Sequence, residues 1–160
     1  MDFVVREAVI EDLEEIVKLW RQLSIGQMEK DPYYSGSLVF QGGETQFKHS
    51  IESSDCGLFI IEYDEKIQGF IEVWKDVKPY YFENENCAYI VHCIYDNQSK
   101  NLEKSIVHMI ASLYYAAENW AKAQGKSYLT ADVFQHNLKV VNLLKRAGLK
   151  PFKVRCVRKI

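Results

Sequence analysis

Segments of two different periodicities alternate along the second half of the chain, and this alternation is the strongest constraint on its fold. A strand-like apolar run at 88–95 is followed by a polar turn at 96–101, and apolar residues then recur at the helical period of 3.6 over 102–121. Gly125 is placed to end this helix. The expected bounds of the elements that follow are Ser127–Phe134 for a strand, Leu138–Ala147 for a helix and Phe152–Val157 for a terminal strand. Strands that alternate with helices predict an α/β domain.

The first half of the chain is predicted to add further strands and two helices. Acidic residues between Glu11 and Glu15 complement the dipole of a helix start, and the apolar residues from Leu13 to Leu23 keep a helical spacing. The polar residues Asp64–Lys66 separate two strand-like runs and predict a β-hairpin. The expected bounds are Phe3–Val5, Leu58–Tyr63 and Ile67–Trp74 for strands, Thr45–Ser53 for a short helix and Gln27–Gly43 for a loop. The predicted order is therefore βααβββαβαβ around a mixed sheet.

Length and composition indicate a single domain, 1–160, of ordinary globular character. The chain has 160 residues, of which 48% are hydrophobic, and a net charge of -2, which argues against nucleic acid as a partner. No apolar run approaches the roughly 20 residues that cross a membrane, so we expect no membrane partner. The four cysteines form no CxxC pair and complete no zinc spacing with histidine, which predicts a reduced, cytoplasmic protein without a metal. We also expect no leader at the N-terminus, where Asp2 stands in place of a basic residue.

Two spaced motifs, together with the element order, resemble the acetyl-CoA-binding half of the GNAT acetyltransferase superfamily. The turn pattern of that family, [QR]-x-x-G-x-[GA], is matched by Gln98-Ser-Lys-Asn101-Leu-Glu103, with Asn101 and Glu103 at the two glycine positions. Its later pattern, N-x-x-A-x-x-x-Y-x-x-x-G-F, is matched from Asn137 to Leu149, with Leu144 at the tyrosine position. The resemblance implies a single GNAT-like α/β domain, with a mixed twisted sheet flanked by helices. It also implies an N-acetyltransferase with acetyl-CoA as co-substrate.

The turn before the long helix is the expected binding site for the pyrophosphate of acetyl-CoA. A helix N-terminus presents unpaired amides and a partial positive charge, and asparagine tolerates a left-handed bend better than most residues that carry a side chain. The resemblance places the pantetheine on the strand that precedes the turn. The residues implied to bind the cofactor are Cys93, Ile94, Tyr95, Gln98, Ser99, Lys100, Asn101, Leu102, Glu103, Lys104 and Asn137. The alternative is an ordinary helix start capped by Ser99 or Asn97.

The acetyl transfer implied by the resemblance needs a base, because an amine with a pKa of about 10.4 is almost fully protonated at pH 7. The candidates are His92 and Tyr95 on the strand 88–95 and Glu72 on the preceding strand; each could equally be structural. Leu144 cannot protonate the departing thiolate as the family's tyrosine does, so another acid or solvent must do so.

The acceptor is expected to be a primary amine of a small molecule or a peptide. Aromatic residues in the loops 33–40 and 80–82 could line its pocket, or could cover the core or form a homodimer surface. Because the motif glycines and the tyrosine are replaced, a catalytically silent GNAT-fold binding or regulatory module is the competing prediction.

Overall fold

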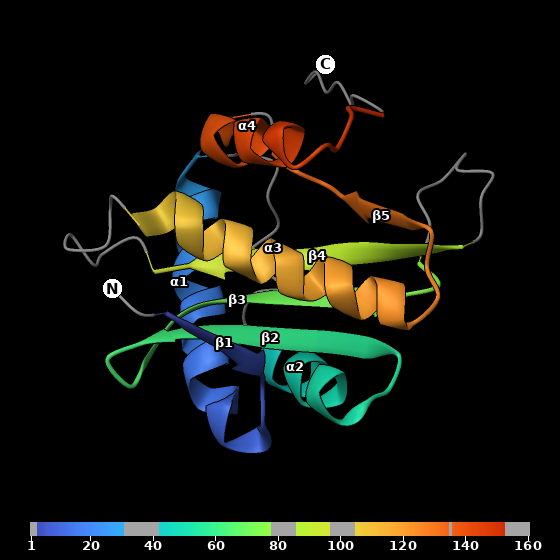
Figure 1. Cartoon of the computed structure of the whole chain (residues 1–160). Coiled ribbons are helices and arrows are strands. Elements are labelled where there is room, and N and C mark those ends of the chain that lie inside the picture. Colours follow the sequence, from blue (N-terminus) through green and yellow to red (C-terminus); the bar gives the residue numbers. More distant parts are fainter. Residues whose placement is uncertain (1–2, 31–41, 78–85, 97–104, 135, 153–160) are drawn as a thin grey trace, which may run out of the picture.

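β-Branched and aromatic residues form a five-stranded sheet with helices on both faces (Figure 1). The computed structural model describes residues 3–30, 42–77, 86–96, 105–134 and 136–152. The strands are β1 (Val4–Glu7), β2 (Cys56–Tyr63), β3 (Lys66–Lys75), β4 (Cys87–Tyr95) and β5 (Tyr128–Ala131). The helices are η1 (Ile10–Asp12), α1 (Leu13–Lys30), α2 (Gly43–Glu52), α3 (Ile106–Ala123) and α4 (Leu138–Arg146). The predicted order of elements is confirmed as far as α4, and the terminal strand expected at 152–157 lies outside the described residues except for Phe152.

The strands follow one another in space in the order β1-β2-β3-β4-β5. Neighbours from β1 to β4 are antiparallel, and β5 is parallel to β4. Asp64 and Glu65 both have positive φ angles, 52° and 59°, as a tight hairpin turn between β2 and β3 requires. A parallel pair needs a crossover connection, and α3 lies in the one between β4 and β5. The predicted mixed sheet is confirmed.

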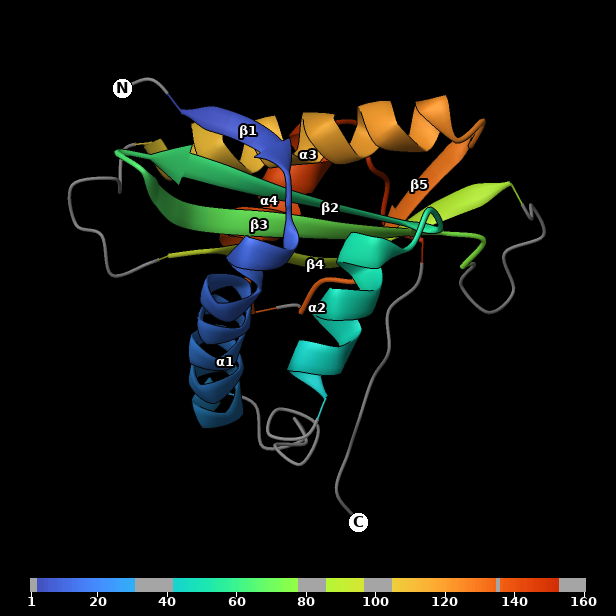
Figure 2. The same ribbon diagram turned by 90° about the horizontal axis from the view of Figure 1, so that it is seen from below.

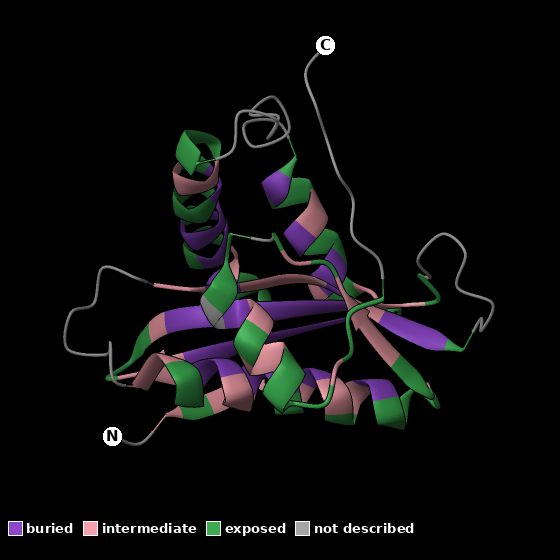
Figure 3. Cartoon of the chain, turned by 90° about the horizontal axis from the view of Figure 1, so that it is seen from above, coloured by how far each residue is buried: buried purple, intermediate pink, exposed green. Residues whose placement is uncertain are grey.

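The two faces of the sheet carry different helices, as Figure 2 shows. α1 and α2 cover one face, and their apolar residues meet Leu58, Ile60, Phe70 and Ile94 of the strands. α3 covers the other face, where it packs on Ile71 and Val73. In Figure 3 the buried residues of the helices face the sheet, and the outer sides of the same helices are exposed. The core is thus divided into two layers by the sheet.

The observed helix ends confirm two of the predicted helix stops and correct one predicted loop boundary. α1 continues to Lys30, so the loop predicted to begin at Gln27 is wrong at its start; Lys30 complements the dipole of the last turn. α3 begins at Ile106, after the N-cap residue Ser105, and the expected helical residue Leu102 lies outside the described residues. Gly125 and Gly148 have φ angles of 72° and 92° just beyond α3 and α4, which confirms both as helix stops.

Candidate active site

A fully buried carboxylate, that of Glu72 on β3, is the centre of the candidate site. Its Oε1 accepts hydrogen bonds from Ser50 Oγ at 2.5 Å and Trp74 Nε1 at 3.0 Å. Its Oε2 accepts from Gln46 Nε2 at 3.0 Å, and lies 2.6 Å from Nδ1 of His92. An ionised carboxylate has about four acceptor positions, and here four neighbouring groups occupy them. Glu72 is thus fully engaged inside the protein.

Three elements bring these groups together. Gln46 and Ser50 are four residues apart on α2 and therefore share the helix face that meets the sheet. Trp74 is two residues from Glu72 on β3, so both side chains stand on the same face. His92 is the cross-strand partner of Glu72 on β4. Glu72 and His92 were predicted as site residues, but Gln46, Ser50 and Trp74 were not, because the docking of a short helix on a strand leaves no spacing signal in the sequence.

A β-bulge in β4 determines which way His92 faces. Glu72 pairs with His92 and Val73 pairs with Ile90, so Val91 is an extra residue in β4. Ile90 packs against the α3 side, whereas Ile94 belongs to the cluster under α1 and α2. Strict alternation would put residues 90, 92 and 94 on one face. The bulge breaks this alternation and places His92 on the α1 and α2 face beside Glu72.

The pair assigns different roles to its two members. Glu72 is 0% exposed, so it cannot reach a bound molecule, whereas the side chain of His92 is 23% exposed. Because Nδ1 of the imidazole faces the carboxylate, the neutral ring carries its proton there, and Nε2 presents a lone pair. Within the described residues Nε2 has no hydrogen-bond partner. The arrangement suits a general base at His92 with Glu72 behind it.

Aromatic rings surround His92 on the helical side. The ring of Phe47 lies 5.6 Å from the imidazole, and that of Trp20 lies 6.4 Å away, edge to face. Both residues are buried, at 0% and 7% exposure. These rings limit the rotation of the imidazole and restrict the access of water to it.

The edge of β4 opens beside this pair. β5 pairs with β4 only from Cys87 to Ile90, although β4 continues to Tyr95. Among the described strands, residues 91–95 have no partner on the β5 side. Backbone groups on a strand edge without a neighbouring strand can pair with a ligand that lies along it.

Tyr95 and Cys93 do not join His92 and Glu72. Both pack against the α3 layer, on the opposite face of the strand. Burial raises the pKa of the Cys93 thiol to about 12 and also raises the pKa of Tyr95. Cys93 therefore stays a neutral thiol near pH 7, and Tyr95 is too far round the strand to act with His92.

The position at which the family has an acid is apolar here. Leu144 of α4 packs against the α3 layer, and a groove between α3 and α4 is lined by Ala111, Tyr114, Tyr115, Leu143, Leu144, Arg146 and Ala147. Tyr89 of β4 donates to Asp132 Oδ2 at 3.2 Å, and burial, with Asp132, raises its pKa to about 12. A phenol with that pKa is a poor donor to a thiolate, whose conjugate acid has a pKa near ~8.5.

The remaining predicted cofactor residues divide into two groups. Asn137 is the N-cap of α4, where its side chain accepts from Val140 N at 3.5 Å. The residues of the turn 98–104, from Gln98 to Lys104, lie outside the described residues. Within the described residues, the first amides of α3 are those that follow Ser105.

The described residues support neither a metal centre nor a membrane span. Among them, no group of three or more His, Cys, Asp or Glu side chains is arranged to hold a metal ion. In the same ranges, no helix is both long and apolar enough to cross a bilayer.

Comparison with known proteins identifies the fold. No family model matches the sequence, and no curated protein matches it. The PaiA N-acetyltransferase of Thermoplasma acidophilum, solved with coenzyme A, is 19% identical, with a TM-score of 0.74 over 97% of this chain and 94% of that one. Glucosamine-6-phosphate N-acetyltransferase of Arabidopsis thaliana is 16% identical, with a TM-score of 0.65 over 99% of both chains. A transcriptional regulator of Bacillus halodurans C-125 is 17% identical, with a TM-score of 0.72 over 99% of this chain and 100% of that one.

These likenesses extend over nearly the whole of each chain. The protein therefore has the fold of the GNAT acetyltransferases, and the predicted fold is confirmed.

Proposed function

We propose that this protein is an N-acetyltransferase that moves an acetyl group from acetyl-CoA to a primary amine. The observation that carries the proposal is the pair of Glu72 and His92, which stands at the point where β4 separates from β5. The proposal is supported by two similar folds that belong to N-acetyltransferases, one of them solved with coenzyme A. The acceptor would be a small molecule or a peptide.

In the proposed reaction, acetyl-CoA lies along the open edge of β4, and its pantetheine pairs with the backbone of Cys93, Ile94 and Tyr95. Nε2 of His92 accepts a proton from the amine, either directly or through one water molecule, as the amine nitrogen attacks the thioester carbonyl. The C–N bond forms and the C–S bond breaks. Coenzyme A leaves as a thiolate and is protonated by solvent, because Leu144 has no proton to give.

Roles for the turn from Gln98 to Lys104, for Asn137 and for Glu72 are also part of this proposal. The turn from Gln98 to Lys104 would hold the pyrophosphate, as the family motif implies, with Lys100 and Lys104 as its cations. Asn137 would act only indirectly, since its side chain caps α4. Glu72 would orient His92 without contacting either substrate.

The test is the release of thiol from acetyl-CoA with a panel of primary amines. We expect turnover with at least one amine, and a loss of about 10²–10⁴ in kcat for His92→Gln, the usual cost of removing a general base. His108→Gln is the matched control and should keep the wild-type rate. Full activity of His92→Gln would remove His92 from the mechanism.

A silent GNAT-fold regulatory module is the second candidate, and two observations favour it. Leu144 stands where the family has its acid, and one protein of similar fold is a transcriptional regulator. Coenzyme A binding without turnover of any amine would support this candidate, whereas turnover would exclude it.

A further inference from the structure

Glu72 is held by three side chains besides His92, one of them buried and the other two half-buried. Ser50 is 2% exposed, and Gln46 and Trp74 are half-buried between α2 and the sheet. We infer that Ser50, Gln46 and Trp74 are positioning residues, which act through Glu72 on the proton of His92. The inference rests on the proposed role of His92 as the base.

The directions of the hydrogen bonds support this inference. An indole nitrogen can only donate, so Trp74 Nε1 donates both to Glu72 Oε1 at 3.0 Å and to Ser50 Oγ at 3.3 Å. Ser50 has one proton, and the 2.5 Å contact assigns it to the same carboxylate oxygen. Glu72 is therefore an acceptor on this side of the network.

The same directions set the tautomer of His92. Gln46 Nε2 contacts both carboxylate oxygens, at 3.0 and 3.3 Å, and so fixes the plane of the carboxylate. Oε2 is then turned to Nδ1 of His92 at 2.6 Å. Since an acceptor faces Nδ1, that nitrogen carries the ring proton and Nε2 stays free to accept one.

Burial makes these contacts effective. The carboxylate is 0% exposed, so water cannot replace a lost donor without a rearrangement of α2 or β3. No buried side-chain nitrogen or oxygen of the described residues lacks a hydrogen-bond partner. Removal of one donor should therefore change how strongly Glu72 holds the proton of His92.

The experiment is an NMR titration of the imidazole protons, in the absence of acetyl-CoA. The chain has four histidines, and the signal of His92 is assigned by its loss in His92→Gln. In Ser50→Ala and Trp74→Phe, the carboxylate has one donor fewer and should hold the imidazolium more strongly. We expect the midpoint of the His92 titration to rise in both variants.

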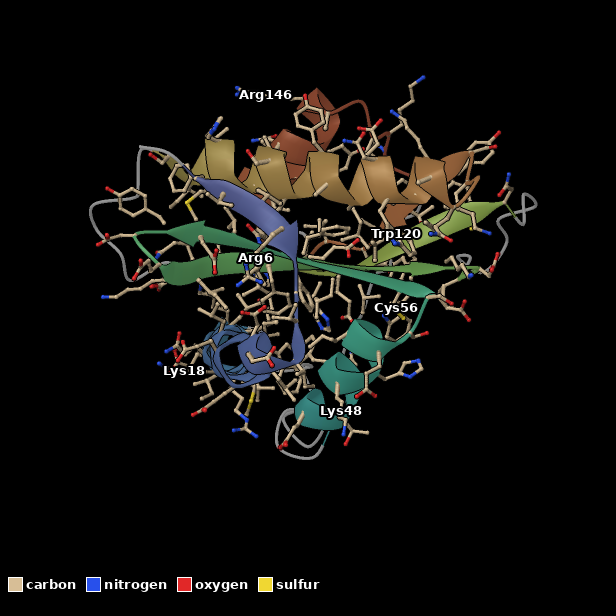
Figure 4. All side chains as sticks on the ribbon, turned by 60° about the horizontal axis from the view of Figure 1, so that its bottom comes forward. Arg6, Lys18, Lys48, Cys56, Trp120 and Arg146 are labelled. Atoms are coloured by element: carbon tan, nitrogen blue, oxygen red, sulfur yellow. The ribbon has the colours of Figure 1, made fainter. Side chains whose placement is uncertain are left out.

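Two further substitutions test the direction of the change in the His92 midpoint and do not depend on the folding of the Ser50 and Trp74 variants. Glu72→Gln removes the negative charge, so the midpoint should fall. Gln46→Met alters a half-buried residue of α2, and should raise the midpoint as Ser50→Ala does. The matched controls are Ser24→Ala, at a buried serine of α1, and Trp120→Phe, on the α3 side of the sheet (Figure 4); both should leave the midpoint unchanged.

Turnover supplies a second readout. If the proposed function holds, Ser50→Ala and Trp74→Phe should lower kcat by less than His92→Gln does, and should leave KM for acetyl-CoA unchanged.

The outcomes separate the inference from the proposed function. Unchanged midpoints in Ser50→Ala, Trp74→Phe and Gln46→Met would overturn the inference, even if His92→Gln abolished turnover. Shifted midpoints together with full activity of His92→Gln would leave the network standing and reject His92 as the base.

Discussion

At the scale of single residues, two buried carboxylates of this chain are compensated in different ways. Glu72 is surrounded by neutral donors and one histidine, whereas Asp12 faces the permanent charge of Arg6. Arg6 contacts the two oxygens of Asp12 at 2.7 and 2.9 Å, and it also binds Glu62 at 2.7 Å. The backbone amide of Val9 donates to Asp12 at 2.8 Å. A fixed ion pair of this kind ties β1, η1 and β2 together and has no group left to titrate near neutral pH, so it is structural.

The Asp12 contact predicts a stability that depends on pH. The hydrogen bond from Arg6 lowers the pKa of Asp12 below its ordinary value of 3.8. A lowered pKa means that the contribution is present above about 3.8 and is lost as the pH falls through the folded-state value. We expect Asp12→Asn to lower the free energy of unfolding by about 1–2 kcal/mol at pH 7, measured by urea denaturation. The difference from wild type should shrink when the measurement is repeated in acid.

Glu15→Gln is the control for this prediction. Glu15 pairs with Lys18 at 3.2 Å, but both side chains are more than half exposed. Solvent screens such a pair, so the substitution should change stability by less than about 0.5 kcal/mol. An Asp12→Asn variant as stable as Glu15→Gln at pH 7 would contradict the structural role of Arg6 and Asp12.

At the scale of elements, the bulge at Val91 divides β4 into two parts. One half of the strand, up to Ile90, pairs with β5, and the other half presents His92 and an open edge. A bulge bends its strand and ends regular pairing. One extra residue therefore accounts both for the face on which His92 lies and for the end of the β4–β5 pairing at Ile90.

Deletion of Val91 tests whether the bulge keeps β5 from pairing with the second part of β4. In the shortened strand Ile90 would be followed directly by His92, and simple alternation would still place His92 on the α1 and α2 face. We expect the deletion variant to fold, with a loss of stability below about 2 kcal/mol, because the faces of the flanking residues are unchanged. With the bend removed, β5 should pair further along β4, and stabilisation by coenzyme A should be lost in a thermal-shift measurement.

Val91→Thr keeps the residue count and serves as the control, with coenzyme A binding expected to match wild type. If the deletion variant were stabilised by coenzyme A as much as wild type, the cofactor could not lie along the open edge of β4. The proposed place of the pantetheine would then be wrong.

The elements also show what the sequence could and could not predict. The regular spacing of apolar residues predicted α1 and α3, because burial on one face imposes a period. The polar residues Asp64–Lys66 between two strand-like runs predicted the hairpin of β2 and β3. The bulge was not predicted, since an inserted residue such as Val91 is as strand-like as its neighbours. Gln46 was missed for a related reason: its role depends on where α2 docks on β3, a long-range contact. The end of α1 was misplaced because its last residues are mostly exposed, and exposed residues carry no apolar period.

At the scale of the whole molecule, the two faces of the sheet differ in chemical character. The α3 face is an apolar layer. The side chains of two predicted site residues, Cys93 and Tyr95, pack against this layer and do not face His92. The α1 and α2 face contains Glu72 and His92, with Gln46 and Ser50, beside an apolar cluster. α1 also spans this side beyond β4, since Gln27 Nε2 lies 3.0 Å from His136 Nε2, in the connection between β5 and α4. A ligand along residues 91–95 of β4 would therefore meet His92 from one side only.

The last prediction concerns the cofactor and the whole chain. If acetyl-CoA binds as proposed, a saturating concentration of coenzyme A, about 100 times its Kd, should stabilise the folded state by about 2.7 kcal/mol. For a chain of this size that corresponds to a rise of roughly 5–10 °C in Tm, measured by thermal unfolding with and without ligand.

Two charge reversals test whether the turn 98–104 binds the phosphates. Lys100→Glu places a negative charge in the turn and should reduce the rise in Tm by weakening the binding of coenzyme A. Lys48→Glu makes the same change at an exposed position of α2 (Figure 4), and should leave the rise intact. Asn101→Gly should keep or increase the rise, because glycine adopts a left-handed bend without strain. An equal rise in all four proteins would show that coenzyme A binds away from this turn, and no rise in wild type would remove the first step of the proposed reaction.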